Sequence, residues 1–524
     1  MSPRAKAKGV AAAILAAALL ALPVGAADGP PYRDPKRGVQ KQTEAAAAAR
    51  DVARKGKEAA KDVLVSLGDD SGVVRDAVFL EILKWSAGDL AALQPGLELK
   101  DEIACRNVAE AFGRKKVASA RKSLETLLKR RKEPGALVEI ARALGEIGDP
   151  ESAKELELAL RAGKDPWVSD AALVAVTKCD PKGAVARLEK AFADEELSLR
   201  ISALLRLAEL DEPRAAAAAL AAVKTKDQLK PRGSPWIPRL LFAALDTLSG
   251  LKDRGKSAPT IKEAIDALIP RIDIEEGRAR HEVCQTLRSL TGEHDIADEK
   301  FAWESWWKVQ RDSFDPSKVK PRPKGEGGGA GDGAGGTVVR YHGIPIYSKR
   351  VCFMLDLSGG MDRVIDDKVA ESPRRLDYAK KELAEVLRSL DEDVAVNIIF
   401  FSSTYDSAAK ELVPLKRSRR AFIDFVSKQE IPETVHMNRG NIYDPLVLAM
   451  DDPSIDTVFL LSEGNPTEGL FQDKDRFVFH MSQRNRLAQT RVFTLFIGSA
   501  GSARGYVRAI AEATGGDFHD VATR

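Results

Sequence analysis

The sequence predicts a protein of two folded parts, an all-α array of helical repeats followed by a doubly wound α/β domain. Three observations predict this fold class. Turns that contain aspartate recur every 31 residues in the middle of the chain, a Pro- and Gly-rich segment occupies 316–340, and beyond it apolar runs of strand length alternate with helical periodicity. At 524 residues, with 44% hydrophobic and 30% charged residues, the chain has the length and composition of a multidomain globular protein.

Residues 1–26 are predicted to be a secretory signal peptide. Basic residues at 4, 6 and 8 precede an apolar run at 10–22, and small residues at 24–26 suit a signal peptidase. An uncleaved anchor is the alternative, but the run is shorter than the roughly 17–25 residues that span a bilayer. We therefore expect an extracytoplasmic protein, periplasmic or secreted, with a flexible N-terminus at 27–43.

Charge, cysteine content and histidine spacing limit the kinds of partner and of binding site that we expect. Cleavage would change 81 basic and 78 acidic residues into 78 of each. A chain without net charge gives no electrostatic reason to bind nucleic acid or a membrane surface, so protein partners are expected. Four widely spaced cysteines, at 105, 179, 284 and 352, form neither a disulfide framework nor a CxxC pair. The histidines lack zinc-ligand spacing, and no later stretch is predicted to span a membrane.

Residues 44–315 are predicted to form the helical array. Asp149-Pro150 recurs as Asp180-Pro181 and as Asp211-Glu212-Pro213, and each turn leads into an alanine- and leucine-rich stretch. Aspartate can cap the free N–H groups of a helix, and proline is tolerated in the first turn. Helix pairs cannot bury their apolar faces alone, so they stack. Residues 138–223 resemble short bacterial HEAT-type repeats. An irregular helical bundle is the alternative.

Three tryptophans mark the expected end of the array. The spacing of Trp303, Trp306 and Trp307 places the indoles on one helical face, where we expect them to cover the last open apolar surface rather than stack on a ligand. The glycines of 316–340 are not preceded by a strand or followed by Gly-Lys-Ser/Thr, so they form a flexible linker and no phosphate loop. Such a linker lets the two parts reorient unless an interface holds them.

Residues 341–524 are predicted to form a Rossmann-like parallel sheet covered by helices. Strands are expected at 351–355, 394–401, 458–461 and 492–497, a strand after Gly516 closes the sheet, and 411–415 is expected to pair beside 394–401. Helices are expected at 376–390, 419–428, 443–450 and 506–514. Ligands of such sheets bind at the carboxyl ends of the strands.

The loops at those strand ends resemble the von Willebrand factor A family. Residues 356–361, Asp-Leu-Ser-Gly-Gly-Met, resemble its motif Asp-x-Ser-x-Ser-Met, and 439–446 resemble Gly-Thr-Asn-Ile-Tyr-Asp-Ala-Leu. Residues 460–464 resemble Leu-Leu-Thr-Asp-Gly, and 514–518 resemble the family's closing strand. The entry at 341–350 is similar to that of bacterial proteins that join HEAT repeats to an A domain.

The resemblance implies a metal-ion-dependent adhesion site of oxygen ligands around magnesium. Asp356 and Ser358 are retained and Glu463 replaces an aspartate, but Gly360 and Gly440 stand where a serine and a threonine are expected. One interpretation keeps a magnesium site, with water or the acidic residues at 362, 366 and 367 in the vacant positions. The other is a metal-free interaction domain. Magnesium is the only cofactor that the pattern suggests.

The predicted function is that of a non-enzymatic extracytoplasmic interaction or scaffold protein. The inner face of the array and the top of the sheet are the expected binding surfaces. Magnesium-dependent adhesion is one alternative. A distant alternative is a serine hydrolase, because 356–360 is close to a G-x-S-x-G elbow and His519 could act as its base. The elbow lacks its first glycine, and Ser358 follows the first strand, so no enzymatic activity is predicted.

Overall fold

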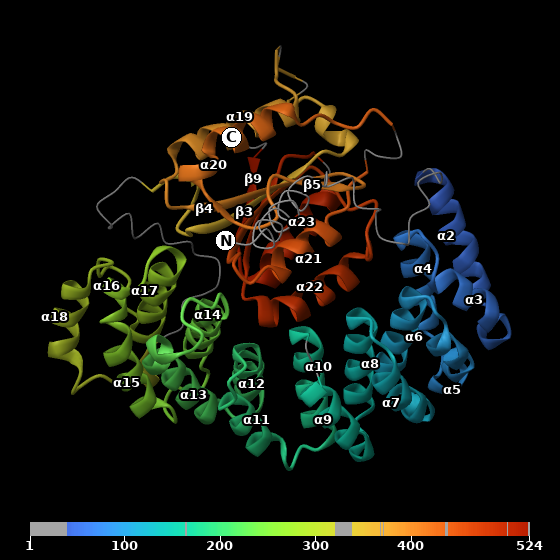
Figure 1. The fold of residues 1–524 in the computed structure, drawn as a ribbon, viewed down its shortest axis with the longest axis horizontal. Coiled ribbons are helices and arrows are strands. Elements are labelled where there is room, and N and C mark those ends of the chain that lie inside the picture. The colour runs from blue at the N-terminus through green and yellow to red at the C-terminus, as the bar shows by residue number, and fades with distance from the viewer. Residues whose placement is uncertain are drawn as a thin grey trace, which may run out of the picture.

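The computed structural model describes residues 39–162, 165–319, 338–366, 368–369, 371–434, 439–499 and 501–521. Its helical part forms an arc, and the α/β part lies inside that arc (Figure 1). The fold class predicted from the sequence is confirmed. The helices of the arc are α2 (Val39–Ala53), α3 (Ala60–Leu67), α4 (Gly72–Ile82), α5 (Ala87–Leu90), α6 (Glu102–Arg114), α7 (Arg121–Arg130), α8 (Pro134–Ile147), α9 (Ala153–Ala162), α10 (Pro166–Cys179), α11 (Ala184–Phe192), α12 (Leu197–Leu210), α13 (Glu212–Thr225), α14 (Trp236–Ser249), α15 (Ala258–Leu268), α16 (Arg271–Ile274), α17 (Gly277–Thr291) and α18 (Lys300–Gln310).

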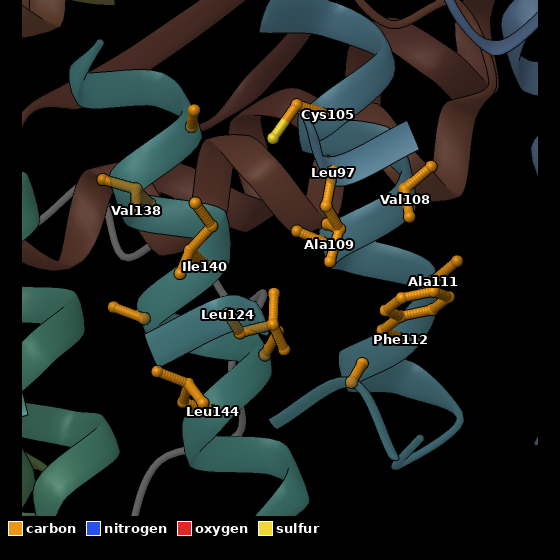
Figure 2. Packing of buried hydrophobic residues seen from close by; sticks show 14 of the residues in the cluster. Leu97, Cys105, Val108, Ala109, Ala111, Phe112, Leu124, Val138, Ile140 and Leu144 are labelled. Carbon is orange, nitrogen blue, oxygen red and sulfur yellow. The ribbon is translucent and has the colours of Figure 1, made fainter. Parts of the chain in front are cut away.

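The repeat spacing reflects close contacts between neighbouring helices. A Cβ added to Gly113 of α6 would lie 2.8 Å from Cα of Ala143 on α8, and one added to Gly145 of α8 would lie 2.7 Å from Cα of Ala175 on α10. Only glycine allows the backbones to approach so closely. Leucine, isoleucine and phenylalanine side chains of α6, α7 and α8 fill the space beside these crossings (Figure 2). The repeats from α2 to α12 therefore share one core, and a second core runs from α12 to α18.

Two of the three aspartates of the repeat turns cap helices as expected. Asp149 accepts a hydrogen bond from the N–H of Glu151, and Asp211 accepts one from the N–H of Arg214 at the start of α13. Asp180 accepts from the N–H of Gly183 in the turn before α11. Asp149 and Asp211 thus supply an acceptor that the first turn of a helix lacks, whereas Asp180 holds the turn itself and α11 has no side-chain cap.

Tryptophans close the far end of the arc. Trp303 is fully buried and Trp307 nearly so, both in the core that α12–α17 share. The indole N–H of Trp307 donates to Asp266 over 2.7 Å. These contacts confirm that the indoles cover the last apolar surface of the array.

The C-terminal domain is a mostly parallel sheet in the order β5-β4-β3-β7-β8-β9. Strands β3, β4, β7, β8 and β9 run parallel, whereas β5 and β6 pair with β4 antiparallel. The expected pairing of 411–415 beside 394–401 is thus confirmed. The elements are β1 (Arg340–Tyr341), β2 (Ile344–Pro345), β3 (Arg350–Asp356), α19 (Arg375–Ser389), β4 (Ala395–Phe401), β5 (Tyr405–Ser407), β6 (Val413–Pro414), α20 (Leu415–Lys428), α21 (Tyr443–Asp451), β7 (Thr457–Ser462), α22 (Lys474–Ala488), β8 (Arg491–Phe496), α23 (Gly501–Thr514) and β9 (Phe518–Asp520).

Helices cover both faces of the sheet. Helices α19 and α20 pack on the outer face, and α21, α22 and α23 pack on the face that looks into the arc (Figure 1). Helix α22 was not predicted from the sequence. It fills the position nearest the solenoid, and its Leu487 belongs to the same hydrophobic cluster as α12–α17.

The solenoid and the α/β domain meet along an extended interface, which we call the seam. Ile103 of α6 joins the core of α21 and α22, and ion pairs cross the seam between Arg476 and Asp76, Arg486 and Glu209, and Arg491 and Glu282. The sequence led us to expect that the two parts could reorient unless an interface held them, and in this structure the seam is such an interface. The inner face of the array, expected to be free for a partner, is covered by the chain's own α/β domain.

Several sequence predictions fall on residues outside those described. They include the signal peptide at 1–26 and most of the linker at 316–340. Helix α2 begins at Val39, inside the segment expected to be flexible, and β1 begins at Arg340. Among the described residues, no helix combines the length and the apolar character required to cross a bilayer. All four cysteines are buried and unpaired with one another.

Candidate functional site

Asp356 lies at the carboxyl end of β3, where the sequence placed the first candidate ligand. It is 2% exposed, its Oδ1 accepts from the N–H of Ser358 over 2.7 Å, and its Oδ2 accepts from the hydroxyl of Ser462 over 2.7 Å. Burial raises the pKa of Asp356, and the hydrogen bonds from Ser462 and Ser358 oppose that shift. The carboxylate therefore ties the ends of β3 and β7 together.

Glu463 fills the space that a side chain at position 360 would take. A Cβ on Gly360 would lie 1.9 Å from Oε1 of Glu463 and 2.1 Å from its carboxyl carbon. Glutamate carries its carboxylate on a longer stem than the aspartate expected there. The replacements at 360 and 463 are thus complementary in shape, because the longer side chain of Glu463 takes the space that a side chain at position 360 would need.

Arg375 places a positive charge against that carboxylate. This first residue of α19 is 4% exposed, and its Nη1 lies 3.1 Å from the carbonyl oxygen of Gly360 and 3.3 Å from Oε2 of Glu463. Burial raises the pKa of Glu463, the charge of Asp356 adds to the effect, and the charge of Arg375 opposes it. Arg375 is not recognisable as a site residue from the sequence, because no motif there links it to the loops of the site.

The loop at Gly440 is held by a neighbouring loop. The N–H of Gly440 donates to the hydroxyl of Thr467 over 3.0 Å, and its carbonyl accepts from the N–H groups of Thr467 and Glu468. Beside it Arg439, 3% exposed, forms an ion pair with Glu468 over 3.0 Å. A Cβ on Gly440 would lie 3.9 Å from the carbonyl oxygen of Asn465 and 3.9 Å from Cβ of Ser358, so a side chain there would make only ordinary van der Waals contacts.

These residues do not fit a magnesium ion in their present arrangement. The carboxylate of Glu463 lies where the second serine would contribute its hydroxyl, and it already has the guanidinium of Arg375 as its counter-ion. A divalent cation would have to displace that pair or accept a positive charge beside it. Asp362 pairs with Arg374 instead, Asp366 accepts from the N–H of Lys368, and residue 367 lies outside the described residues. Within the described part of the chain, no group of three or more histidine, cysteine, aspartate or glutamate residues is arranged to hold a metal.

Ser358 and His519 are not brought together. The strands put Leu355 beside Leu461, Leu461 beside Leu495 and Leu495 beside His519. Three strand spacings of about 4.8 Å separate the two ends of this row, roughly 14 Å in all. A general base must lie within hydrogen-bond reach of its nucleophile.

The seam carries the largest set of polar residues that sequence reasoning missed. Three buried arginines of the solenoid donate to backbone carbonyls of the α/β domain. Arg75 reaches Gly469 and Leu470, and Arg239 reaches Met450 and Asp452 at the end of α21. Arg278 reaches Gln489, just beyond α22, and Asp456. The last carbonyls of a helix lack intrahelical partners and carry partial negative charge, so a buried guanidinium suits them.

Arg476 of α22 lies at the centre of the seam. Its guanidinium donates to Asp76 over 2.6 Å and to Asn107 over 2.8 Å, and it also pairs with Glu110. His480, one turn later, lies 3.3 Å from Glu110 and stacks on Phe471 with ring centroids 3.9 Å apart. Burial lowers the pKa of His480. Burial also acts to raise the pKa of Glu110, but the charge of Arg476, together with the hydrogen bond from His480 and the charge of Arg114, outweighs it and holds that pKa well below its usual range.

One loop joins the candidate site to the seam. It runs from Glu463 in the site, past the contacts of Thr467 and Glu468 with Gly440, to Gly469 and Leu470, which accept from Arg75. Two further N–H groups of this loop, at 472 and 473, donate to Asp76, each over 2.7 Å. The site is therefore anchored directly to the first repeats of the solenoid.

Comparison with known proteins supports the helical repeats. The family described as HEAT repeats matches residues 90–177, which span α6 to α10. No curated protein matches the chain.

Similar solved structures are distant in sequence. The PilB minor pilin from Streptococcus sanguinis is 14% identical with a TM-score of 0.26, and the match covers 34% of this chain and 58% of the pilin. The complex of CpcE and CpcF of phycocyanin lyase from Nostoc sp. PCC7120 is 17% identical with a TM-score of 0.25, and the match covers 47% of this chain and 99% of that one. This chain thus spans less than two thirds of the pilin's length.

Proposed function

We propose that this protein is a non-enzymatic, extracytoplasmic interaction protein whose C-terminal domain is of the von Willebrand factor A type. The observation that carries the proposal is that one expected binding surface is covered within the chain and the other is exposed. The inner face of the solenoid holds the chain's own α/β domain, while the rim of the candidate site stays exposed. Asp362, Arg363 and Asn465 on that rim are exposed, and Val364 and Val369 are 39% and 55% exposed.

The composition of the rim suits a protein partner. Exposed valines among charged and amide side chains provide a small apolar centre with a polar surround, as in protein–protein interfaces. The separation of Ser358 from His519 supports a non-catalytic role. The extracytoplasmic location rests on the signal-like sequence at 1–26.

A site-specific cross-linking experiment tests this function. A photo-reactive amino acid is placed at Val364 in the full chain, and a matched control carries it at Leu158, an exposed residue of α9. Both proteins are irradiated in the envelope fraction of the native cell. We expect a discrete cross-linked species from position 364 alone. Equal products from both positions, or none from either, would count against a partner at the rim.

A further inference from the structure

We infer that the site of Asp356, Ser358 and Glu463 is metal-independent, because the guanidinium of Arg375 occupies the role of a bound cation. This inference rests on the proposed A-type domain, since that resemblance is the reason to expect a metal here. It goes beyond the proposal by naming what neutralises the site in the metal's place and how the site can engage a partner.

The first step is the match between positions 360 and 463. With any side chain at 360, the carboxylate of Glu463 could not keep its position, because Cβ alone would lie 1.9 Å from Oε1. With aspartate at 463, the shorter stem would leave the space beside Gly360 empty. The two replacements therefore act together, because glycine at 360 makes room for glutamate at 463.

The second step is the resident positive charge. Nη1 of Arg375 bridges the Gly360 carbonyl and the Glu463 carboxylate, and the backbone N–H of Arg375 donates to the carbonyl of Arg363 over 2.9 Å. The same residue thus pins both ends of the loop at 360–374. A charge held by side chain and backbone together is fixed in place, as a structural cation would be.

The third step is the remaining ligand position. Gly440 offers no hydroxyl, and its N–H and carbonyl are both used by Thr467. The hydroxyl of Ser462 is likewise used by Asp356. A partner must therefore contact this edge through direct hydrogen bonds and ion pairs rather than through a shared magnesium ion, so chelators should leave the interaction intact.

Manganese binding to the full-length protein tests the inference, with calorimetry and the loss of the free-ion spin-resonance signal as readouts. Five proteins are compared: wild type, Asp356→Ala, Arg375→Gln, a restored variant carrying Gly360→Ser, Gly440→Thr and Glu463→Asp, and the restored variant with Asp356→Ala added. Circular dichroism and thermal melting check that each is folded. Magnesium is then titrated to confirm the result.

We expect wild type to bind no manganese at millimolar concentration and to show no change in Tm. We expect the restored variant to bind one ion per chain, with a Tm increase of about 4 °C or more once the ion exceeds its Kd roughly 100-fold. Asp356→Ala should abolish that binding. Saturable binding by wild type that Asp356→Ala removes would overturn the inference, and so would a folded restored variant that binds no ion. Replacing Arg375 by Gln in wild type keeps a hydrogen-bond donor but removes the charge, and should raise manganese affinity above that of wild type.

Failure of the metal-independence inference can be distinguished from failure of the proposed function. Cross-linking at position 364 is repeated with chelator and with magnesium. Cross-links that require magnesium would end the inference while leaving a rim partner in place. Absence of cross-links under both conditions would end the proposed function, and the manganese titration would still decide the inference.

Discussion

At the scale of single residues, Gly360 and Gly440 show how two apparently equivalent substitutions differ. Both stand where the resemblance expects a hydroxyl, and the sequence predicted both as gaps in a ligand set. The structure fills one gap with the carboxylate of Glu463 and leaves the other open. The positions of Asp356, Ser358 and Glu463 could be predicted from motifs. The part played by Arg375 could not, since it depends on where a side chain from a later helix points.

This difference predicts unequal responses to a methyl group. Gly360→Ala should push the flexible end of Glu463 away from Arg375 and reduce the free energy of unfolding by about 1 kcal/mol, the order of one partly exposed ion pair. Gly440→Ala is the matched control and should change it by less than about 0.5 kcal/mol, because its Cβ meets nothing within 3.9 Å. Urea unfolding measures both. Equal effects would contradict the packing described for position 360.

At the scale of helices and strands, prediction succeeded where an element is buried against apolar neighbours alone. The runs at 351–355, 394–401, 458–461 and 492–497 became β3, β4, β7 and β8 because buried parallel strands are continuously apolar. Helix α22 was missed for the opposite reason. Phe477 and Met481 pack on the sheet, but Arg476 and His480 are buried against the carboxylates of the solenoid. A helix that packs against buried carboxylates has charged residues on its buried face, so its sequence resembles that of a surface segment.

The buried arginines at the ends of α21 and α22 are expected to contribute more to stability than arginines in exposed ion pairs. Arg239→Ala should lower the free energy of unfolding by about 2–3 kcal/mol, because it leaves the carbonyls of Met450 and Asp452 buried without their charged donor. Arg214→Ala removes an ion pair with Glu189 in which both side chains are more than half exposed, and should cost less than about 1 kcal/mol. Thermal melting compares the two. Hydrogen exchange should also quicken at the end of α21 in the first variant alone.

At the scale of the whole molecule, the seam converts two linked domains into one body. Its centre is close to electrical balance, with three arginines facing three carboxylates and a neutral histidine: Arg114, Arg142, Arg476, Asp76, Glu110, Glu139 and His480. A proton on His480 would leave one buried positive charge uncompensated. The pairs that cross the seam could not be predicted from the sequence, because Arg476 and His480 lie more than 300 residues from their partners in the solenoid.

That balance predicts acid sensitivity of the seam. The pKa of His480 is lowered in the closed protein, so the open form binds more protons at low pH. The stabilisation is complete above the ordinary histidine pKa of about 6.5 and is lost as the pH falls below it. The protection of α22 against hydrogen exchange, after correction for the intrinsic exchange rate at each pH, should therefore decrease between about pH 7 and 5. His480→Phe retains the stacking on Phe471 and should remove this dependence, whereas an unchanged pH response in that variant would assign it to another group.

The central claim is that the seam, and not the linker, holds the α/β domain inside the solenoid. A protease site introduced into the glycine-rich stretch at 325–336 allows the linker to be cut in the folded protein, and gel filtration at pH 8 then reports whether the halves remain together. The account predicts that they co-elute at low micromolar concentration, and that Arg278→Ala combined with Arg476→Ala makes them separate after the cut. Separation of the wild-type halves at that pH would contradict it.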